Sequence, residues 1–191
     1  GLRNGLAAHG LADTWPILVV GKVGTDLHTN FFDPDVARML VAVAGEYGSF
    51  IKGHYSDFVE NPSAYPQAGM GAANVGPEFT QAEYEALLEL TAMEDECLGA
   101  GGAGEGSCFR QVLTRAVLES GRWMKWRLPE EMGLPFEEYA PARQEWLVKT
   151  GCRYVWTQPA VRVARARLYA NLARYGLDGE RIVLERIARA I

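Results

Sequence analysis

The sequence lacks several patterns that would assign it to a common class of protein. Its 191 residues contain only three cysteines, and no two of them form a CxxC pair. A zinc knuckle or a disulfide framework is therefore not expected. Cys97, Cys108 and Cys152 are predicted to be small buried or half-buried thiols in a reducing compartment.

Long apolar runs are absent as well. No run approaches the ~20 residues that span a membrane, and the first residues do not form the apolar region of a signal peptide. We therefore expect a cytoplasmic protein without a membrane partner. The chain does not begin with methionine, which is compatible with a start inside a longer chain.

A concentration of positive charge is also missing. The net charge is −5, and basic residues are scattered except for Arg162, Arg165 and Arg167. This is a poor footprint for nucleic acid, so no nucleic-acid partner is expected. With 48% hydrophobic residues the chain can bury a sizeable core, and a small-molecule ligand fits its mildly acidic surface.

What is present is a repeated order of strand, polar loop and helix. Strands are predicted over about residues 17–24, 49–54 and 70–75, because short apolar runs there end in polar residues. This rhythm favours a parallel sheet or a (β/α) barrel over residues 1–106. Residues 107–191 contain only helical patterns and predict a C-terminal helical extension packed on the first part.

Two histidines follow predicted strands directly. Parallel strands open at one edge of a sheet, so His28 and His54 are expected to converge there and to bind a divalent metal, zinc or manganese. The alternative is that each imidazole only bonds to a loop. Asp57 is the candidate for proton transfer, with loop capping as its alternative.

Other polar residues near the same strand ends are candidates for substrate binding. The loop at Asn74 and Gly76 precedes a helix, where backbone N–H groups favour an anion such as phosphate, although a plain turn would use the same residues. Lys22 and Lys52 lie in apolar runs and would form a Schiff base, bond to a neighbour or reach the solvent face. The full set of expected substrate contacts is Lys22, Asp26, Lys52, Ser56, Asn74 and Gly76.

These motifs resemble the GatZ/KbaZ family, the so-called non-catalytic subunit of class II tagatose-bisphosphate aldolase. The resemblance lies in the run at residues 19–30, in the Gly-His-Tyr-Ser-Asp segment at 53–57, and in the Asn-Val-Gly-Pro-Glu-Phe segment at 74–79. The strand end at His54 is similar also to tagatose and tagaturonate epimerases. The match covers most of the chain.

The resemblance implies a (β/α)8 barrel of which residues 1–106 would be the last three βα units. His28 and His54 would match the family's histidines after strands six and seven, and Asn74 and Gly76 its last-strand loop. The family's other metal ligands have no counterpart here, and the Gly-rich loop at 99–106 departs from the family.

The expected activity is metal-dependent aldol cleavage or epimerisation of a ketose or ketose phosphate. The alternative is a non-catalytic barrel subunit that stabilises a partner aldolase. In either case an unpaired sheet edge would call for a partner subunit or for self-association.

Overall fold

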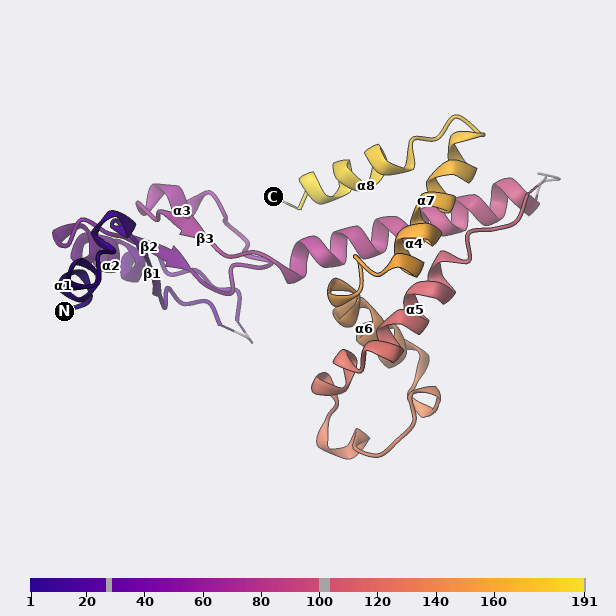
Figure 1. Ribbon diagram of the computed structural model, residues 1–191, viewed down its shortest axis with the longest axis horizontal. Coiled ribbons are helices and arrows are strands. Elements are labelled where there is room, and N and C mark those ends of the chain that lie inside the picture. The colour runs from indigo at the N-terminus through magenta and orange to yellow at the C-terminus, as the bar shows by residue number, and fades with distance from the viewer. Residues whose placement is uncertain (27–28, 100–103, 191) are drawn as a thin grey trace. The chain divides into compact units, whose positions relative to one another are not determined.

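The structure, a computed structural model, describes residues 1–26, 29–99 and 104–190. The chain divides into two compact units, residues 1–76 and 77–191 (Figure 1). The first unit contains a small sheet, and every regular element of the described part of the second unit is helical. None of the described helices is both long and apolar enough to cross a membrane.

Three parallel strands form the sheet of the first unit. They are β1 (Leu18–Gly21), β2 (Phe50–Gly53) and β3 (Ala72–Ala73), in the order β1-β2-β3. All pairs are parallel, with Val19 opposite Ile51 in the first ladder. The strands lie inside the three segments whose apolar runs predict strands, because short β-branched runs favour the extended backbone.

The described residues of this unit also form four helical segments: α1 (Leu2–Ala8), η1 (Ala12–Thr14), α2 (Pro34–Glu46) and α3 (Ala64–Gln67). Helix α2 begins where the sequence predicts. The Asp33 side chain accepts hydrogen bonds from two backbone N–H groups of the first turn, and Pro34 occupies the first helical position.

Helices α2 and α3 cover the same face of the sheet. A Cβ on Gly21 would lie within 3.0 Å of the Leu40 side chain of α2, and one on Gly53 would lie 2.6 Å from the Tyr65 ring of α3. The Tyr65 ring stacks on Phe32 with centroids 4.0 Å apart, and both are buried. The glycines in the strands therefore let the helices approach closely.

The prediction that residues 1–106 form the C-terminal part of a (β/α)8 barrel is wrong. The described residues hold three strands in an open sheet within a mainly helical chain, which is a small α/β fold. The spacing of the βα units does predict parallel pairing between neighbours. The spacing does not predict that the sheet closes into a barrel. Closure requires further strands whose number, tilt and stagger agree.

The second unit is built from five α-helices and four single-turn elements among its described residues. The α-helices are α4 (Pro77–Gly99), α5 (Phe109–Ser120), α6 (Pro141–Gly151), α7 (Pro159–Ala173) and α8 (Gly179–Ala188). The 3₁₀ turns are η2 (Arg122–Trp126), η3 (Pro129–Glu131), η4 (Phe136–Glu138) and η5 (Cys152–Tyr154).

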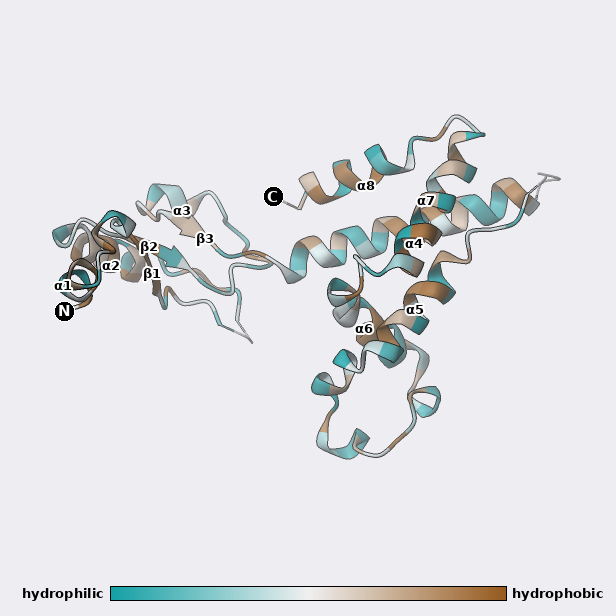
Figure 2. Cartoon of the chain, in the orientation of Figure 1, coloured by the Kyte–Doolittle hydropathy of each residue, from teal (hydrophilic) through white to brown (hydrophobic). Residues whose placement is uncertain are grey.

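Helix α4 is the element against which the second unit assembles. It contacts α5, α6, α7 and α8, and its residues alternate between hydrophobic and hydrophilic along its length (Figure 2). Leu87 and Leu90 on α4 are completely buried, as are Phe109 on α5 and Leu168 on α7. Burying each such side chain stabilises the unit by about 1.5–3 kcal/mol.

A buried carboxylate joins three parts of this unit. Glu94 on α4 is 1% exposed. It accepts hydrogen bonds from the Ser107 N–H at 3.0 and 3.1 Å, from the Ser107 hydroxyl at 2.5 Å and from Asn171 Nδ2 on α7 at 2.5 Å. A buried charge is tolerated when its oxygens are satisfied in this way.

A second carboxylate, that of Glu131 in η3, forms an ion pair with Arg143 of α6. The Arg143 guanidinium donates to both Glu131 oxygens, at 2.6 and 2.7 Å, and to the Trp126 carbonyl at 2.6 Å. These bonds lower the pKa of Glu131 below its usual value. The stabilisation is therefore present above the usual glutamate pKa and is lost as pH falls through the lowered one.

The close packing around Gly53 predicts that a larger residue at this position lowers the stability of the protein. We expect Gly53→Ala to reduce the free energy of unfolding by about 1–3 kcal/mol, because the new methyl group would overlap the Tyr65 ring. The matched control is Gly45→Ala on α2, where a Cβ meets nothing within 4 Å. That change should stabilise the protein by roughly 0.5–1 kcal/mol. Urea denaturation measures both, and equal effects would contradict the close approach of α3.

The Glu94 network predicts a charge requirement. We expect Glu94→Gln to cost about 2–3 kcal/mol, because three donors face the carboxylate and an amide brings a further donor among them. The control is Glu89→Gln, which removes an exposed ion pair with Arg186 and should lower the stability much less than Glu94→Gln, because solvent screens exposed charges. Thermal unfolding of the two variants compares them, and a harmless Glu94→Gln would show that the network is dispensable.

Candidate functional site

Polar residues gather where the three parallel strands end. The segments that follow β2 and β3 stay paired beyond the strands: Asn74 N–H donates to the Gly53 carbonyl and Ser56 N–H donates to the Asn74 carbonyl, each at 3.1 Å. The carboxyl ends of parallel strands meet at one edge, which is where α/β proteins bind ligands. The predicted residues His54, Ser56, Asp57 and Asn74 are therefore brought together by backbone hydrogen bonds.

Asp57 and Lys52 have defined positions at this edge. One Asp57 oxygen accepts a hydrogen bond from the Gly76 N–H at 2.9 Å. Lys52 Nζ donates to Asn74 Oδ1 at 3.3 Å. Four residues predicted to bind substrate or to act in catalysis thus form two hydrogen-bonded pairs, Asp57 with Gly76 and Lys52 with Asn74. The Gly76 N–H is one of the donors that the sequence predicts for a phosphate in this loop. In the structure it donates to Asp57 instead.

His54 carries a buried ring nitrogen. Its backbone carbonyl accepts a hydrogen bond from the Thr25 hydroxyl at 2.7 Å, which ties the segment after β1 to the end of β2. Its Nδ1 atom has no hydrogen-bond partner among the described residues, and the same holds for the hydroxyls of Ser56 and Tyr65, both of which are 6% exposed. Unsatisfied buried polar atoms are rare and mark places where a ligand or water binds.

The backbone around the turn is strained. Tyr55 and Phe58 have φ angles of 54° and 56°, in the left-handed region that residues with a Cβ seldom adopt. The Phe58 carbonyl accepts a hydrogen bond from Asn30 Nδ2 at 2.9 Å, which helps to hold this conformation. Strain of this kind is concentrated at binding and active sites.

The remaining predicted residues lie apart from these pairs. Lys22 Nζ lies 3.5 Å from Asp26 and its side chain is 76% exposed, so it is not desolvated as a Schiff-base lysine would be. Asp26 N–H also bonds to the Thr29 carbonyl at 2.9 Å.

The predicted metal site cannot be assembled from the described residues. His28 lies outside them, and among the residues that the structure describes no three His, Cys, Asp or Glu side chains converge. His54 alone does not make a zinc or manganese shell, which needs at least three protein ligands. Binding of a divalent metal by His28 and His54 stays a prediction.

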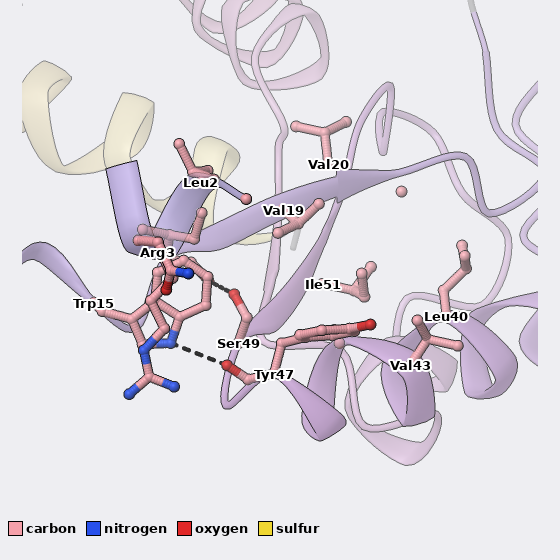
Figure 3. Close-up of a pocket in the computed structure, with 15 residues that line it drawn as sticks. Leu2, Arg3, Trp15, Val19, Val20, Leu40, Val43, Tyr47, Ser49 and Ile51 are labelled. Atoms are coloured by element: carbon pink, nitrogen blue, oxygen red, sulfur yellow. Dashed lines mark hydrogen bonds between the residues drawn. The ribbon is translucent and has the colours of Figure 1, made fainter. Parts of the chain in front are cut away.

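A separate apolar groove lies alongside β1. It has a volume of about 600 Å³ and is bordered by α1, Trp15, β1 and α2 (Figure 3). Trp15 Nε1 donates to the carbonyls of Tyr47 and Gly48 at 3.1 and 3.0 Å, and the Ser49 hydroxyl donates to the Ile17 carbonyl at 2.5 Å. Its walls come from segments far apart in the sequence, so no local motif predicts it.

The cysteines differ in exposure. Cys152 is completely buried, and desolvation raises the pKa of its thiol to about 12, which leaves it without a reactive thiolate at neutral pH. Cys97 is partly exposed and Cys108 is exposed. The predicted burial therefore applies to Cys152, to a lesser degree to Cys97, and not to Cys108.

Comparison with known proteins identifies a structure of similar fold and does not assign the chain to a family. No protein-family model matches the chain. A crystal structure of a probable tagatose 6 phosphate kinase from Sinorhizobium meliloti 1021 is similar over 97% of this chain, with a TM-score of 0.67 and 19% identity. The match covers 48% of that chain, so this chain spans about half of its length. At this identity the likeness concerns the fold alone.

The thiol environments predict a labelling order. In the native protein a maleimide should react with Cys108 at least roughly tenfold faster than with Cys152, because only the thiolate attacks and burial disfavours it. Mass spectrometry of the labelled peptides measures the two rates. In denaturant the rates should become equal, and fast native labelling of Cys152 would contradict its burial.

Proposed function

We propose that this chain acts on a ketose or ketose phosphate by aldol cleavage or epimerisation, as its resemblance to the tagatose-bisphosphate aldolase subunit family implies. The observation that carries the proposal is the polar edge of the sheet, where Asp57 is fixed by the Gly76 N–H and His54 Nδ1 is buried without a partner among the described residues. A polyhydroxylated ligand offers both the donors and the acceptors that such a site requires.

Asp57 is the proposed proton acceptor. In an aldol cleavage its carboxylate takes the proton of the hydroxyl beside the bond that breaks, and the electron pair of that bond moves toward the ketone. The products are an aldehyde and an enolate. The ammonium of Lys52, which comes from β2 and donates to Asn74 after β3, is the proposed hydrogen-bond donor to the enolate oxygen.

Ketose phosphates are proposed as the substrate class on the family resemblance, and the name of the structural neighbour agrees with that choice. The family resemblance implies tagatose phosphates, and the structural neighbour is described as a probable tagatose 6 phosphate kinase. Both substrates are ketose phosphates, although phosphoryl transfer is a different reaction from aldol cleavage. A single assay panel can separate the two, because only a kinase consumes a nucleotide.

The second candidate function is a non-catalytic subunit that stabilises a partner aldolase. It is favoured by the apolar groove beside β1, which suits a protein contact rather than a sugar. It is favoured also because the described residues do not complete a metal shell.

The proposal predicts the effect of removing one charge. We expect Asp57→Asn to lower kcat for ketose-phosphate turnover by roughly 10²–10⁴-fold with little change in KM, because the variant keeps an acceptor for the Gly76 N–H and loses the base. The control is Asp35→Asn, which changes an exposed carboxylate on α2. Product formation from a panel of tagatose phosphates measures both.

Wild-type-like turnover by Asp57→Asn would contradict the assigned role. Absence of turnover by the wild-type chain, together with increased activity or lifetime of an added tagatose-bisphosphate aldolase, would favour the second candidate.

A further inference from the structure

Three cations surround the ring of Tyr154 in the second unit. Arg122 and Lys125 come from η2, and Arg153 comes from η5, as Tyr154 itself does. The Cζ atoms of Arg122 and Arg153 lie 5.4 and 5.2 Å from the ring centroid, and Lys125 Nζ lies 4.8 Å from it. Lys125 Nζ also donates a hydrogen bond to the Tyr154 hydroxyl at 3.4 Å. These four residues are called the cationic cluster, and the fold assembles it from two separate segments.

The cationic cluster is exposed and has no carboxylate partner in the described part of the chain. Its three cations are exposed, and Tyr154 is 38% exposed. None of the ion pairs that the described residues form includes a cation of the cluster. Glu119 and Glu130, which flank η2 in the sequence, form no ion pair with it either. Like charges held around one ring repel one another, and a bound anion relieves that repulsion.

Two helix ends offset part of this charge. Helix α5 ends at Ser120, just before η2, and α6 ends at Gly151, just before η5. The C-terminus of a helix carries about half a negative elementary charge. Two such ends therefore offset about one of the three positive charges and leave about two without compensation. A phosphate monoester carries a charge of about −1.5 to −2 at pH 7, which matches that excess.

The aromatic rings at this place are already covered by the cations of the cluster. Lys125 Nζ lies 5.1 Å from the Trp126 centroid as well as over Tyr154, and the two rings are 5.9 Å apart. A nucleobase would have to displace these cations to stack on either ring, so the arrangement favours a compact anion over single-stranded nucleic acid. The rings also restrict the cations, and donors that are already ordered lose less conformational entropy on binding.

We propose that the cationic cluster binds the phosphate group of a small, soluble phosphate monoester. The guanidinium groups of Arg122 and Arg153 donate hydrogen bonds to the phosphate oxygens, and the ammonium of Lys125 supplies a third positive charge. All residues of the cluster belong to the second unit, and none of them is part of the polar edge of the sheet. The proposal therefore does not depend on the proposed activity.

Isothermal titration calorimetry of the purified 191-residue chain tests the proposal with inorganic phosphate and glycerol 3-phosphate, and with glycerol as the uncharged comparison. Both phosphates should bind in a saturable manner, and glycerol should not bind. Arg122→Gln and Arg153→Gln should each raise the dissociation constant of glycerol 3-phosphate at least roughly tenfold, because each removes a charged donor. The matched control is Arg189→Gln, which removes the charge of an exposed arginine after α8 and should leave the constant within about twofold of wild type, because solvent and salt screen distant charges.

A second pair of variants tests the organising role of the ring. Tyr154→Leu keeps all three charges and removes the ring that orders them, so it should raise the dissociation constant at least roughly threefold. Tyr154→Phe keeps the ring and should bind more tightly than Tyr154→Leu. Circular dichroism establishes that each variant is folded.

Four outcomes would overturn the proposal. The first is that the wild-type chain does not bind the phosphates, and the second is that Arg122→Gln and Arg153→Gln leave binding unchanged. The third is an equal loss in Arg189→Gln, which would show an effect of net charge alone. The fourth is binding to vesicles that contain phosphatidic acid without binding of the soluble probes, which would assign the cluster to a membrane surface. Asp57→Asn should bind glycerol 3-phosphate as the wild type does, so the failure of this proposal and the failure of the proposed activity are distinguishable.

Discussion

The parallel pairing of three short strands is the constraint on which the candidate site depends. Strands β1, β2 and β3 contribute few residues, yet their common direction places every carboxyl end at one edge. Hydrogen bonds beyond the strands, from Ser56 and Asn74 across the sheet, extend this order into the loops. Asp57 is therefore positioned by a bond to a backbone N–H, and Lys52 by a bond to the Asn74 side chain that the paired strand ends bring beside it. The strained backbone at Tyr55 is part of the same arrangement.

The second unit depends on a different interaction, a buried charge. Glu94 links α4 to the segment before α5 and to α7, and it takes donors from backbone, hydroxyl and amide. An apolar side chain at that position would pack, but it would leave the Ser107 N–H and the Asn171 amide without these bonds. The carboxylate therefore selects one arrangement of α7 against α4, while the leucines around it supply most of the stabilisation.

Local features were predictable from the sequence, and features that need distant partners were not. The start of α2 follows from Asp33 and Pro34, because a cap acts within one helical turn. The three strands follow from short apolar runs. The role of Glu94 was not predictable, because its partners lie 13 and 77 residues away and the residue looks like any exposed glutamate of an acidic helix. The error over the barrel has the same origin, since closure depends on strands beyond the neighbours in the sequence. The meeting of Asp57 with Gly76 required the register of β2 against β3.

The bond between Asp57 and Gly76 also lies at the boundary between the two units. Gly76 ends the first unit, and Pro77, the first residue of α4, follows it directly. The proline has no N–H and fixes its own φ, so the Gly76 N–H is the last backbone donor before α4. A change at Asp57 therefore reaches the last backbone donor of the first unit directly, one residue before α4 begins.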